Sequence, residues 1–330
     1  MRLLVLGGTE FVGRALVEEG LRRGWDVTTF NRGTRSPLPG VTPLVGDRSD
    51  PNGLAALTIS GLEWDVVADT WSWAPSAVRD TARVLEDRAR NYVYISSSSV
   101  YRFPTAAGSN EDAPVVDSSP DDEAFDDYAR AKAGAERAVT DIFGERALLA
   151  RPGLILGPHE NIGRLPWWLL RAARGGPILA PGVPEAGVQY IDARDLASWC
   201  LSAAQNNVSG PVNAISRPGA TTMGELLTSC LHATHSTGHL EWTPVGKVLD
   251  AGIEPWTQLP IWLPPGEIHD TMFNIDVSKA MSTGCTIRPI EETVRDTWAW
   301  LQSIGGVAPQ RPDRPPVGLM PALEKQLLAS

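Results

Sequence analysis

The 330-residue chain has little cysteine, no excess of positive charge and no long apolar run. Its three cysteines, Cys200, Cys230 and Cys285, are far apart and form no Cys-x-x-Cys pair, so we expect a reduced, cytoplasmic protein. The net charge of −10 speaks against nucleic-acid binding through a broad basic surface. No stretch of about 18 apolar residues is present, which predicts no membrane span.

The first half of the chain alternates strand and helix patterns. Short apolar runs lie at 2–6, 26–30, 42–45, 65–69, 92–96 and 147–151. Helical patterns lie between most of these runs, at about 11–23, 76–89 and 124–143. Strands separated by helices predict βαβ units, and therefore an α/β fold with a doubly wound parallel sheet of the Rossmann type.

The second half differs in composition, because eight of the twelve tryptophans follow residue 156. We expect helices at about 164–174, 193–205, 223–233 and 290–303, and an aromatic loop at 254–269, where prolines exclude a regular helix. These patterns predict a Rossmann domain over residues 1–156, to which 187–213 returns. Residues 157–186 and 214–305 would form a smaller, mixed substrate-binding lobe, and 306–330 a Pro-rich linker with a short C-terminal helix.

A glycine-rich loop joins the first predicted strand to the first predicted helix. A dinucleotide pyrophosphate needs a tight turn, a backbone that it can approach closely and the free N–H groups of a helix N-terminus. A plain strand–helix turn is the less favoured alternative, since the strand and the helix are both expected. The Glu10 carboxylate would repel a pyrophosphate, so we expect it to point away. The residues of this loop that we expect at the cofactor are Gly7, Thr9, Glu10, Phe11, Val12 and Gly13.

The end of the second predicted strand indicates which dinucleotide binds. NAD-binding proteins usually place an acid there for the ribose 2′-hydroxyl, whereas an arginine suits the 2′-phosphate of NADP. This chain has no acid but has Asn31, Arg32 and Arg35, which predicts NADP(H) with Arg32 as the main contact and NAD as the alternative. Arg32 as an ordinary solvated loop residue is the competing interpretation. Asp47, at the end of the third strand and followed by Arg48, is placed to reach the adenine.

A catalytic set is predicted from a tyrosine, a lysine and a serine. Tyr128 and Lys132 are four residues apart on a predicted helix, so both side chains lie on one face. A phenol has a pKa near 10, and a nearby ammonium group lowers it toward the range of a general base. Lys132 would also hold the nicotinamide ribose. Ser98 would donate a hydrogen bond to the substrate oxygen, although Ser97 or Ser99 could hold that role, since four serines occupy 96–99.

Over about residues 1–303 the chain resembles the extended or atypical short-chain dehydrogenases/reductases of the NAD-dependent epimerase/dehydratase family. The matching motifs are Gly-Gly-Thr-x-Phe-x-Gly at 7–13, Ser-Ser-Ser-Val-Tyr at 97–101, Tyr-x-x-x-Lys at 128–132, Arg-Pro-Gly-Leu-Ile-Leu-Gly-Pro at 151–158, Tyr-Ile-Asp-Ala-Arg-Asp-Leu-Ala at 190–197 and Asp-Val-Ser-Lys-Ala at 276–280. The resemblance implies a two-lobed fold, a bound nicotinamide cofactor and a Ser-Tyr-Lys catalytic set.

Departures from this family narrow the expected substrate. Related sugar-nucleotide dehydratases carry Asp-Glu after the catalytic serine or threonine, where this chain has Ser99-Val100. Related epimerases bind the diphosphate with an arginine at the position of Val188, and no arginine lies between Arg217 and Arg288. A buried diphosphate without an arginine would be costly. We therefore expect a small substrate without a nucleotide diphosphate, and the tryptophan-rich second lobe favours an apolar or aromatic one.

Several residues are weaker candidates for substrate contacts. Trp71, Trp73 and Trp256 could stack on substrate, although core packing is the alternative for each. Ser99 and His159 lie next to predicted strand ends, where a plain loop role explains His159 at least as well. We expect no metal site, because the third histidine of the 232–239 segment leaves the helix face of the other two.

The patterns together predict an NADP(H)-dependent oxidoreductase of the keto/hydroxy reductase type, monomeric or homodimeric, acting on a small molecule. An epimerase or dehydratase that recycles its cofactor is the second hypothesis. A non-catalytic relative that binds RNA is the third, and the acidic charge argues against it.

Overall fold

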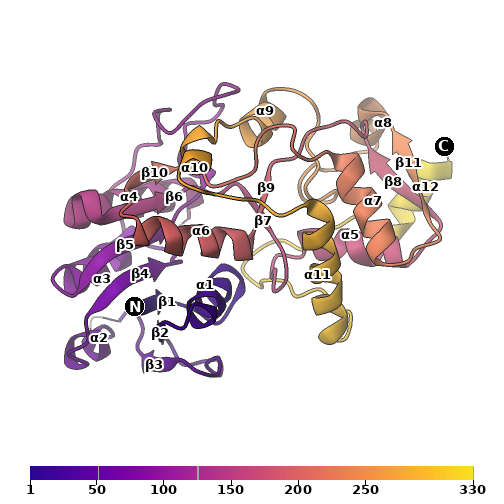
Figure 1. Cartoon of the computed structure of the whole chain (residues 1–330). Coiled ribbons are helices and arrows are strands. Elements are labelled where there is room, and N and C mark those ends of the chain that lie inside the picture. Colours follow the sequence, from indigo (N-terminus) through magenta and orange to yellow (C-terminus); the bar gives the residue numbers. More distant parts are fainter. Residues whose placement is uncertain (51, 125, 330) are drawn as a thin grey trace.

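The computed structural model describes residues 1–50, 52–124 and 126–329. It confirms the predicted parallel α/β sheet: the seven strands lie in the order β10-β6-β5-β4-β1-β2-β3, and all neighbouring strands are parallel (Figure 1). The strands are β1 (Arg2–Leu6), β2 (Asp26–Asn31), β3 (Thr42–Val45), β4 (Trp64–Asp69), β5 (Ala89–Ile95), β6 (Ala147–Ala150) and β10 (Gly210–Val212). Successive strands are added to one side of β1 up to β3 and then, from β4 onward, to its other side. Doubly wound sheets bind ligands at the carboxyl ends of the strands where this order reverses.

Helices cover both faces of this sheet, as Figure 1 shows. On one face α1 (Phe11–Arg22) packs against α6 (Ala193–Gln205), and on the other α3 (Pro75–Leu85) packs against α4 (Tyr128–Phe143), beside the short α2 (Ala55–Ile59). Two separate apolar clusters fill these layers, one between the sheet and α1–α6 and one beneath α3 and α4. The burial of both faces explains why the strands read as continuous apolar runs.

The start of α4 differs from the sequence prediction of 124–143, of which residue 125 lies outside the described residues. The helix begins at Tyr128, because the Asp127 carboxylate accepts a hydrogen bond from the Arg130 N–H at 3.0 Å and caps the first turn. Tyr128 therefore lies at the helix terminus and Lys132 one turn inside it. This places the two side chains at different depths from the surface.

Most of the remaining elements form a second lobe with its own apolar core, whereas Ala280 of α10 (Ser278–Ser282) packs into the cluster between the sheet and α1–α6. The expected helices are confirmed as α5 (Arg164–Ala173), α6, α7 (Met223–Ala233) and α11 (Ile290–Ser303). The expected loop at 254–269 is irregular up to residue 266, but α9 (Glu267–Phe273) begins after the last proline. The other elements are the strands β7 (Leu154–Leu156), β8 (Pro177–Pro181), β9 (Tyr190–Asp192) and β11 (His239–Thr243), and the helices α8 (Val245–Asp250), α10 (Ser278–Ser282) and α12 (Pro321–Ala329).

The C-terminal segment is anchored on this second lobe. Leu319 and Leu327 join its core, and the Glu324 carboxylate on α12 forms a buried salt bridge with Arg171 at 2.7 Å. The Gly318 N–H also donates to the Thr257 carbonyl at 2.8 Å. Residues 306–320, which we call the strap, are thus fixed at one end by α11 and at the other by α12.

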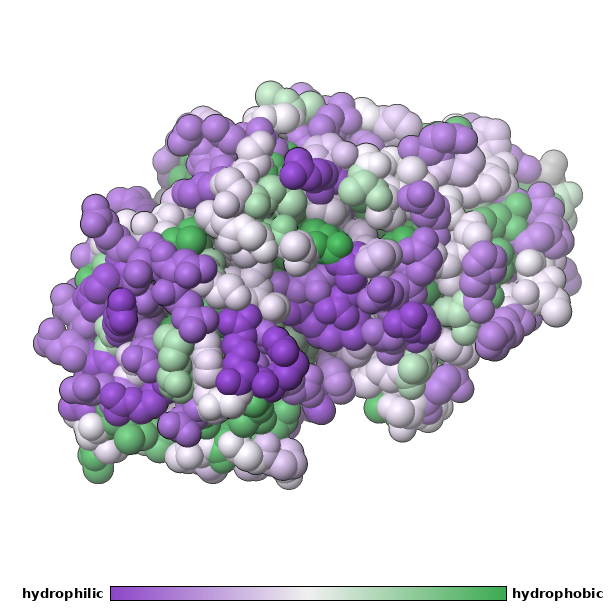
Figure 2. All heavy atoms as spheres, in the orientation of Figure 1, coloured by the Kyte–Doolittle hydropathy of each residue, from purple (hydrophilic) through white to green (hydrophobic). Residues whose placement is uncertain are grey.

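Hydrophilic side chains cover most of the face shown in Figure 2, and apolar ones form only small patches on it. Within the described residues, no helix combines the length and the apolar character that crossing a membrane requires.

Candidate active site

The glycine loop at the carboxyl end of β1 has a backbone that larger residues could not adopt. Gly7 and Gly8 have φ values of 115° and 94°, in the region that favours glycine. A Cβ atom on Gly13 would lie 2.8 Å from the Gly8 nitrogen, so the first turn of α1 packs directly on the loop backbone. This close approach, followed by a helix N-terminus, is the arrangement that a pyrophosphate requires.

Glu10 lies at the N-cap position of α1, but its side chain makes no capping hydrogen bond. Its carboxylate instead pairs with Arg35 and accepts a hydrogen bond from Asn161 Nδ2 at 3.1 Å. The negative charge is therefore compensated locally, and the first turn of the helix is left without a side-chain acceptor. Both features favour an anionic ligand at this terminus.

A cavity of about 290 Å³ continues from the loop to the ends of β2 and β3 and is lined by Asn31, Arg32, Arg35, Asp47 and Arg48. Asn31 Nδ2 donates to the Gly7 carbonyl at 3.0 Å, which ties the end of β2 to the glycine loop. Arg32 is exposed at the cavity rim. The cavity has the position and the polar lining expected for the adenosine half of a dinucleotide.

Arg48 differs from the other residues of this cavity, because its guanidinium group is already engaged. It forms a buried salt bridge with Asp69 at 2.7 Å and donates to Thr81 Oγ1 at 2.8 Å. The hydroxyl of Tyr92 donates to the same Asp69 at 2.6 Å. Arg48 is therefore placed to shape the cavity floor and support Trp71, over which it lies at 4.9 Å, rather than to pair freely with a phosphate.

Tyr128 lies with Ser97 and Ser98 at the carboxyl end of β5. Its hydroxyl forms a hydrogen bond with the side chain of Ser97, whereas Ser98 only lines the same cavity. The surrounding protein desolvates the Tyr128 hydroxyl and raises its pKa, although 37% of the residue remains exposed toward the cavity. This outweighs the opposite effects of the Ser97 hydrogen bond and of Arg314, Arg164 and Arg311. Of the serines that the sequence left as alternatives, Ser97 is therefore the one whose side chain interacts with the tyrosine hydroxyl.

Lys132 is buried one turn deeper than Tyr128. Its ammonium group donates to the carbonyls of Trp71 at 2.6 Å and Ile95 at 2.7 Å, at the ends of β4 and β5. Burial lowers the pKa of Lys132 to about 7, and the neighbouring Asp69 and Glu136 only partly offset this. The ammonium group lies over the ring of Tyr94 at 4.7 Å. The hydrogen bonds of Lys132 are therefore to backbone carbonyls at the strand ends and not to Tyr128. Any effect of its charge on the pKa of Tyr128 acts through space.

A buried salt bridge holds α4 in place against the sheet. Arg151, at the end of β6, pairs with Glu136 on α4 at 2.6 Å and donates to the Tyr101 hydroxyl at 3.1 Å. That hydroxyl in turn donates to Asn213 Oδ1 at 2.6 Å. The network links α4 to the strand ends that carry the serines, which fixes the position of the helix N-terminus.

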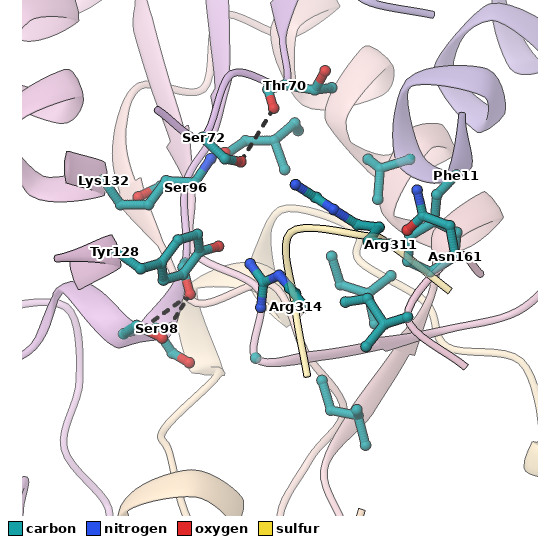
Figure 3. A pocket seen from close by; sticks show the side chains of 18 of the residues that line it. Phe11, Thr70, Ser72, Ser96, Ser98, Tyr128, Lys132, Asn161, Arg311 and Arg314 are labelled. Carbon is teal, nitrogen blue, oxygen red and sulfur yellow. Dashed lines mark hydrogen bonds between the residues drawn. The ribbon is translucent and has the colours of Figure 1, made fainter. Parts of the chain in front are cut away.

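A cavity of about 660 Å³ connects the glycine loop to this group and extends into the second lobe (Figure 3). We call it the large cavity. Trp73, Ser99 and Trp256, which are candidates for substrate contacts from the sequence, line it. Trp71 lies instead at the adenosine-side cavity, where its indole donates to the Ala74 carbonyl at 3.0 Å. His159 does not line either cavity, and its ring packs 5.2 Å from that of Trp300.

Three arginines that sequence reasoning missed also line the large cavity. Arg164 is the first residue of α5, and Arg311 and Arg314 come from the strap. Figure 3 shows Arg311 and Arg314 projecting into the cavity, with Arg314 facing Tyr128. The guanidinium carbon of Arg314 lies 5.5 Å from the centre of the Tyr128 ring. No motif marks these positions, because the path of the strap depends on tertiary packing.

Within the described residues, no three His, Cys, Asp or Glu side chains are grouped as a metal site would require.

Comparisons with known proteins agree with this geometry. A family model described as the NAD dependent epimerase/dehydratase family matches residues 3–216. The chain is 27% identical over 253 residues to the chloroplast stem-loop binding protein of 41 kDa b from Arabidopsis thaliana, with 70% of this chain and 63% of that protein covered. It is 32% identical over 218 residues to the 2-alkyl-3-oxoalkanoate reductase of Stenotrophomonas maltophilia, with 60% and 64% covered. The chain thus spans less than two thirds of the length of either relative.

Among solved structures, the UDP-glucose 4-epimerase of Thermus thermophilus in complex with NAD superposes with a TM-score of 0.65 at 19% identity. The match covers 93% of this chain and all of that one (100%). At this identity the likeness establishes the shared fold, in which both lobes are included.

Proposed function

Because the chain belongs to the NAD dependent epimerase/dehydratase family, we propose that it is an NADP(H)-dependent oxidoreductase acting on a carbonyl or hydroxyl group of a small metabolite. The observation that carries the proposal is the convergence of three features on one cleft. The glycine loop, the adenosine-side cavity and the Tyr128–Ser97 pair all lie at the carboxyl ends of the parallel strands. In a doubly wound sheet this edge is where a dinucleotide and its substrate meet.

The residues of the cleft fit a nicotinamide dinucleotide. The backbone of residues 7–13 would bind the pyrophosphate, and Asn31, Arg32 and Asp47 would surround the adenosine half. When bound, the nicotinamide ring supplies or accepts a hydride. Trp73 and Thr70 line both cavities and so mark the passage between the two halves of the cofactor.

Tyr128 acts as the acid in the direction of reduction. Since burial keeps the pKa of Tyr128 above its usual value, the phenol carries its proton at neutral pH and can donate it to the carbonyl oxygen. The Ser97 hydroxyl hydrogen-bonds the same oxygen and orients it. In the oxidative direction Tyr128 must first lose its proton, and the positive charges of Lys132 and the nearby arginines favour the phenolate that forms.

Preference for NADP(H) rests on Arg32 and on the lack of an acid at the end of β2. Arg35, the second arginine of this segment, is paired with Glu10, so Arg32 is the freer of the two. Its exposed guanidinium at the cavity rim suits the 2′-phosphate. We also propose a reducing, cytoplasmic setting for the enzyme, as a monomer or homodimer; the three cysteines are buried and unpaired.

The test is Tyr128→Phe, assayed with a panel of small aldehydes and ketones by the loss of NADPH fluorescence. We expect an unchanged cofactor dissociation constant and a turnover lower by about 10²–10⁴. Tyr190→Phe is the matched control, because it also deletes one hydroxyl but lies in the second lobe, where it donates to the Arg288 carbonyl at 2.7 Å. Turnover of Tyr128→Phe close to that of the control would overturn the proposed role.

An epimerase that recycles its cofactor is the second candidate, favoured by the fold shared with a UDP-glucose 4-epimerase. It would interconvert two stereoisomers of its substrate with no net consumption of NADPH, because the hydride that the bound cofactor accepts returns to the same carbon. RNA binding is the third candidate, in view of the Arabidopsis relative that is named a stem-loop binding protein, and the net charge of −10 disfavours it. Filter binding across a salt series would detect it through a strongly salt-dependent affinity.

A further inference from the structure

The arginines around Tyr128 are unusual for a site expected to take an uncharged metabolite. Arg164, Arg311 and Arg314 enter the large cavity from two different parts of the chain. The charge of Arg311 is already paired within the chain, since its Nε donates to Asp313 at 2.9 Å and its guanidinium lies over Trp73 at 5.6 Å. The other two need a separate explanation.

Arg164 and Arg314 form no salt bridge with any of the residues that the structure describes. The guanidinium carbon of Arg164 lies 4.9 Å from the centre of the Trp256 ring. The Nε atom of Arg164 is buried, and none of the described residues forms a hydrogen bond with it. Arg314 lies over the ring of Tyr128. A buried N–H donor without an acceptor is costly, which indicates that an acceptor is supplied from outside the chain.

The two guanidinium groups are close enough to affect each other electrostatically. Burial, followed by the charge of Arg314, lowers the pKa of Arg164, and Glu160 opposes this only in part. Burial also raises the pKa of Glu160 to about 7, so that carboxyl carries an incomplete negative charge at neutral pH. The cavity therefore holds an excess of positive charge, and an anionic ligand would relieve it.

Apolar side chains also line this cavity. Its lining includes the side chains of Phe103, Leu263, Ile268 and Met272. Planar guanidinium groups stacked on aromatic rings keep their N–H edges free for two parallel hydrogen bonds to an oxyanion. The cavity thus combines a place for a charged oxygen group with a larger place for an apolar body.

We propose that the substrate carries an anionic oxygen group, a carboxylate or a phosphate, on a small apolar body, and that Arg164 and Arg314 bind this group beside Tyr128. The proposal rests on the proposed function, because it places the reacting oxygen of the substrate at Tyr128. It also assigns a role to the strap, which brings Arg314 over the tyrosine and covers the cavity.

Binding of three probes to the complex with NADP⁺ tests this inference by calorimetry. Benzoate and phenyl phosphate share an aromatic body and differ in the anionic group, whereas benzamide has the same body and no charge. We expect at least one anion to bind about tenfold or more tightly than benzamide. The comparison of the two anions distinguishes a carboxylate site from a phosphate site.

Arg164→Gln and Arg314→Gln should each weaken binding of that anion by about tenfold or more, since each removes a charge-assisted hydrogen bond. Both should leave the affinities for benzamide and NADP⁺ unchanged, which also shows that the variants fold. Arg174→Gln is the matched control, an exposed arginine just beyond the other end of α5. We expect it to bind every probe like the unaltered protein.

The inference is overturned if benzamide binds as tightly as both anions, if neither anion binds at about 10 mM, or if the arginine variants leave anion binding unchanged. None of these results affects the proposed function, because NADP⁺ would still bind and turnover of uncharged carbonyl compounds would still depend on Tyr128. Failure of NADP⁺ itself to bind would instead count against the proposed function.

Discussion

Gly13→Ala is the substitution that probes the cofactor loop most sharply. The added methyl group would lie 2.8 Å from the Gly8 nitrogen and 3.2 Å from the Gly8 Cα atom. Both are backbone atoms, so no flexible side chain can move aside. The loop must therefore shift away from α1 by several tenths of an ångström, about the distance needed to restore ordinary contact.

The shift has two separable consequences. Overpacking of this kind costs about 1–3 kcal/mol of folding stability. A displaced loop also loses one or two charge-assisted hydrogen bonds to a pyrophosphate, each worth about 1.5–3 kcal/mol, which corresponds to at least a tenfold weaker cofactor affinity. Gly246→Ala is the control, because Gly246 lies in the first turn of α8 and its added Cβ would meet no atom within 4 Å. We expect Gly246→Ala to be neutral or to stabilise by about 0.5–1 kcal/mol.

Urea unfolding and calorimetric titration with NADPH measure the two effects independently. We expect Gly13→Ala to lose both stability and affinity, and Gly246→Ala to lose neither. A Gly13→Ala protein that is destabilised but binds NADPH with unchanged affinity would show that the loop is a structural turn only, and the cofactor assignment would be refuted.

Three further predictions follow from single contacts. Arg32→Gln should reduce kcat/KM with NADPH by about tenfold or more and leave that with NADH unchanged, measured by steady-state kinetics; equal loss with both cofactors would contradict the 2′-phosphate contact. Glu324→Gln should lower the free energy of unfolding by about 3 kcal/mol, because it leaves Arg171 buried without its anion, while the exposed Lys325→Gln should be neutral in the same urea titration. Since burial raises the pKa of Glu160 from 4.5 to about 7, the folded state binds the extra proton between these values, and stability should fall as pH rises through that window; Glu160→Gln should remove this slope from urea titrations at several pH values.

Much of the fold could be predicted because its signals are local. Buried parallel strands read as apolar runs, and the helices between them have clear ends, so most elements agree with the expected ranges. The start of α4 was predicted too early, because a single capping contact of Asp127 decides it. The expected loop at 254–269 was drawn slightly too long, because α9 begins at Glu267, just after the last of the prolines that exclude a helix.

The sequence could indicate which residues gather at the candidate site where those residues belong to one short motif. Residues 7–13 and the Tyr128–Lys132 spacing belong to this class, and the structure brings both to one cleft. The sequence could not distinguish Ser97 from Ser98, because adjacent side chains in an extended segment point to opposite sides and four serines follow one another at 96–99. Arg164, Arg311 and Arg314 could not be anticipated either, since their placement depends on how the strap is anchored by distant contacts.

A crystal structure of the protein with NADP⁺ tests the central claim most directly. The account predicts the pyrophosphate at the N-terminus of α1, the 2′-phosphate within hydrogen-bonding distance of Arg32, and the nicotinamide end of the cofactor beside Tyr128 and Lys132. A cofactor bound elsewhere, or bound with its nicotinamide ring away from Tyr128, would contradict it.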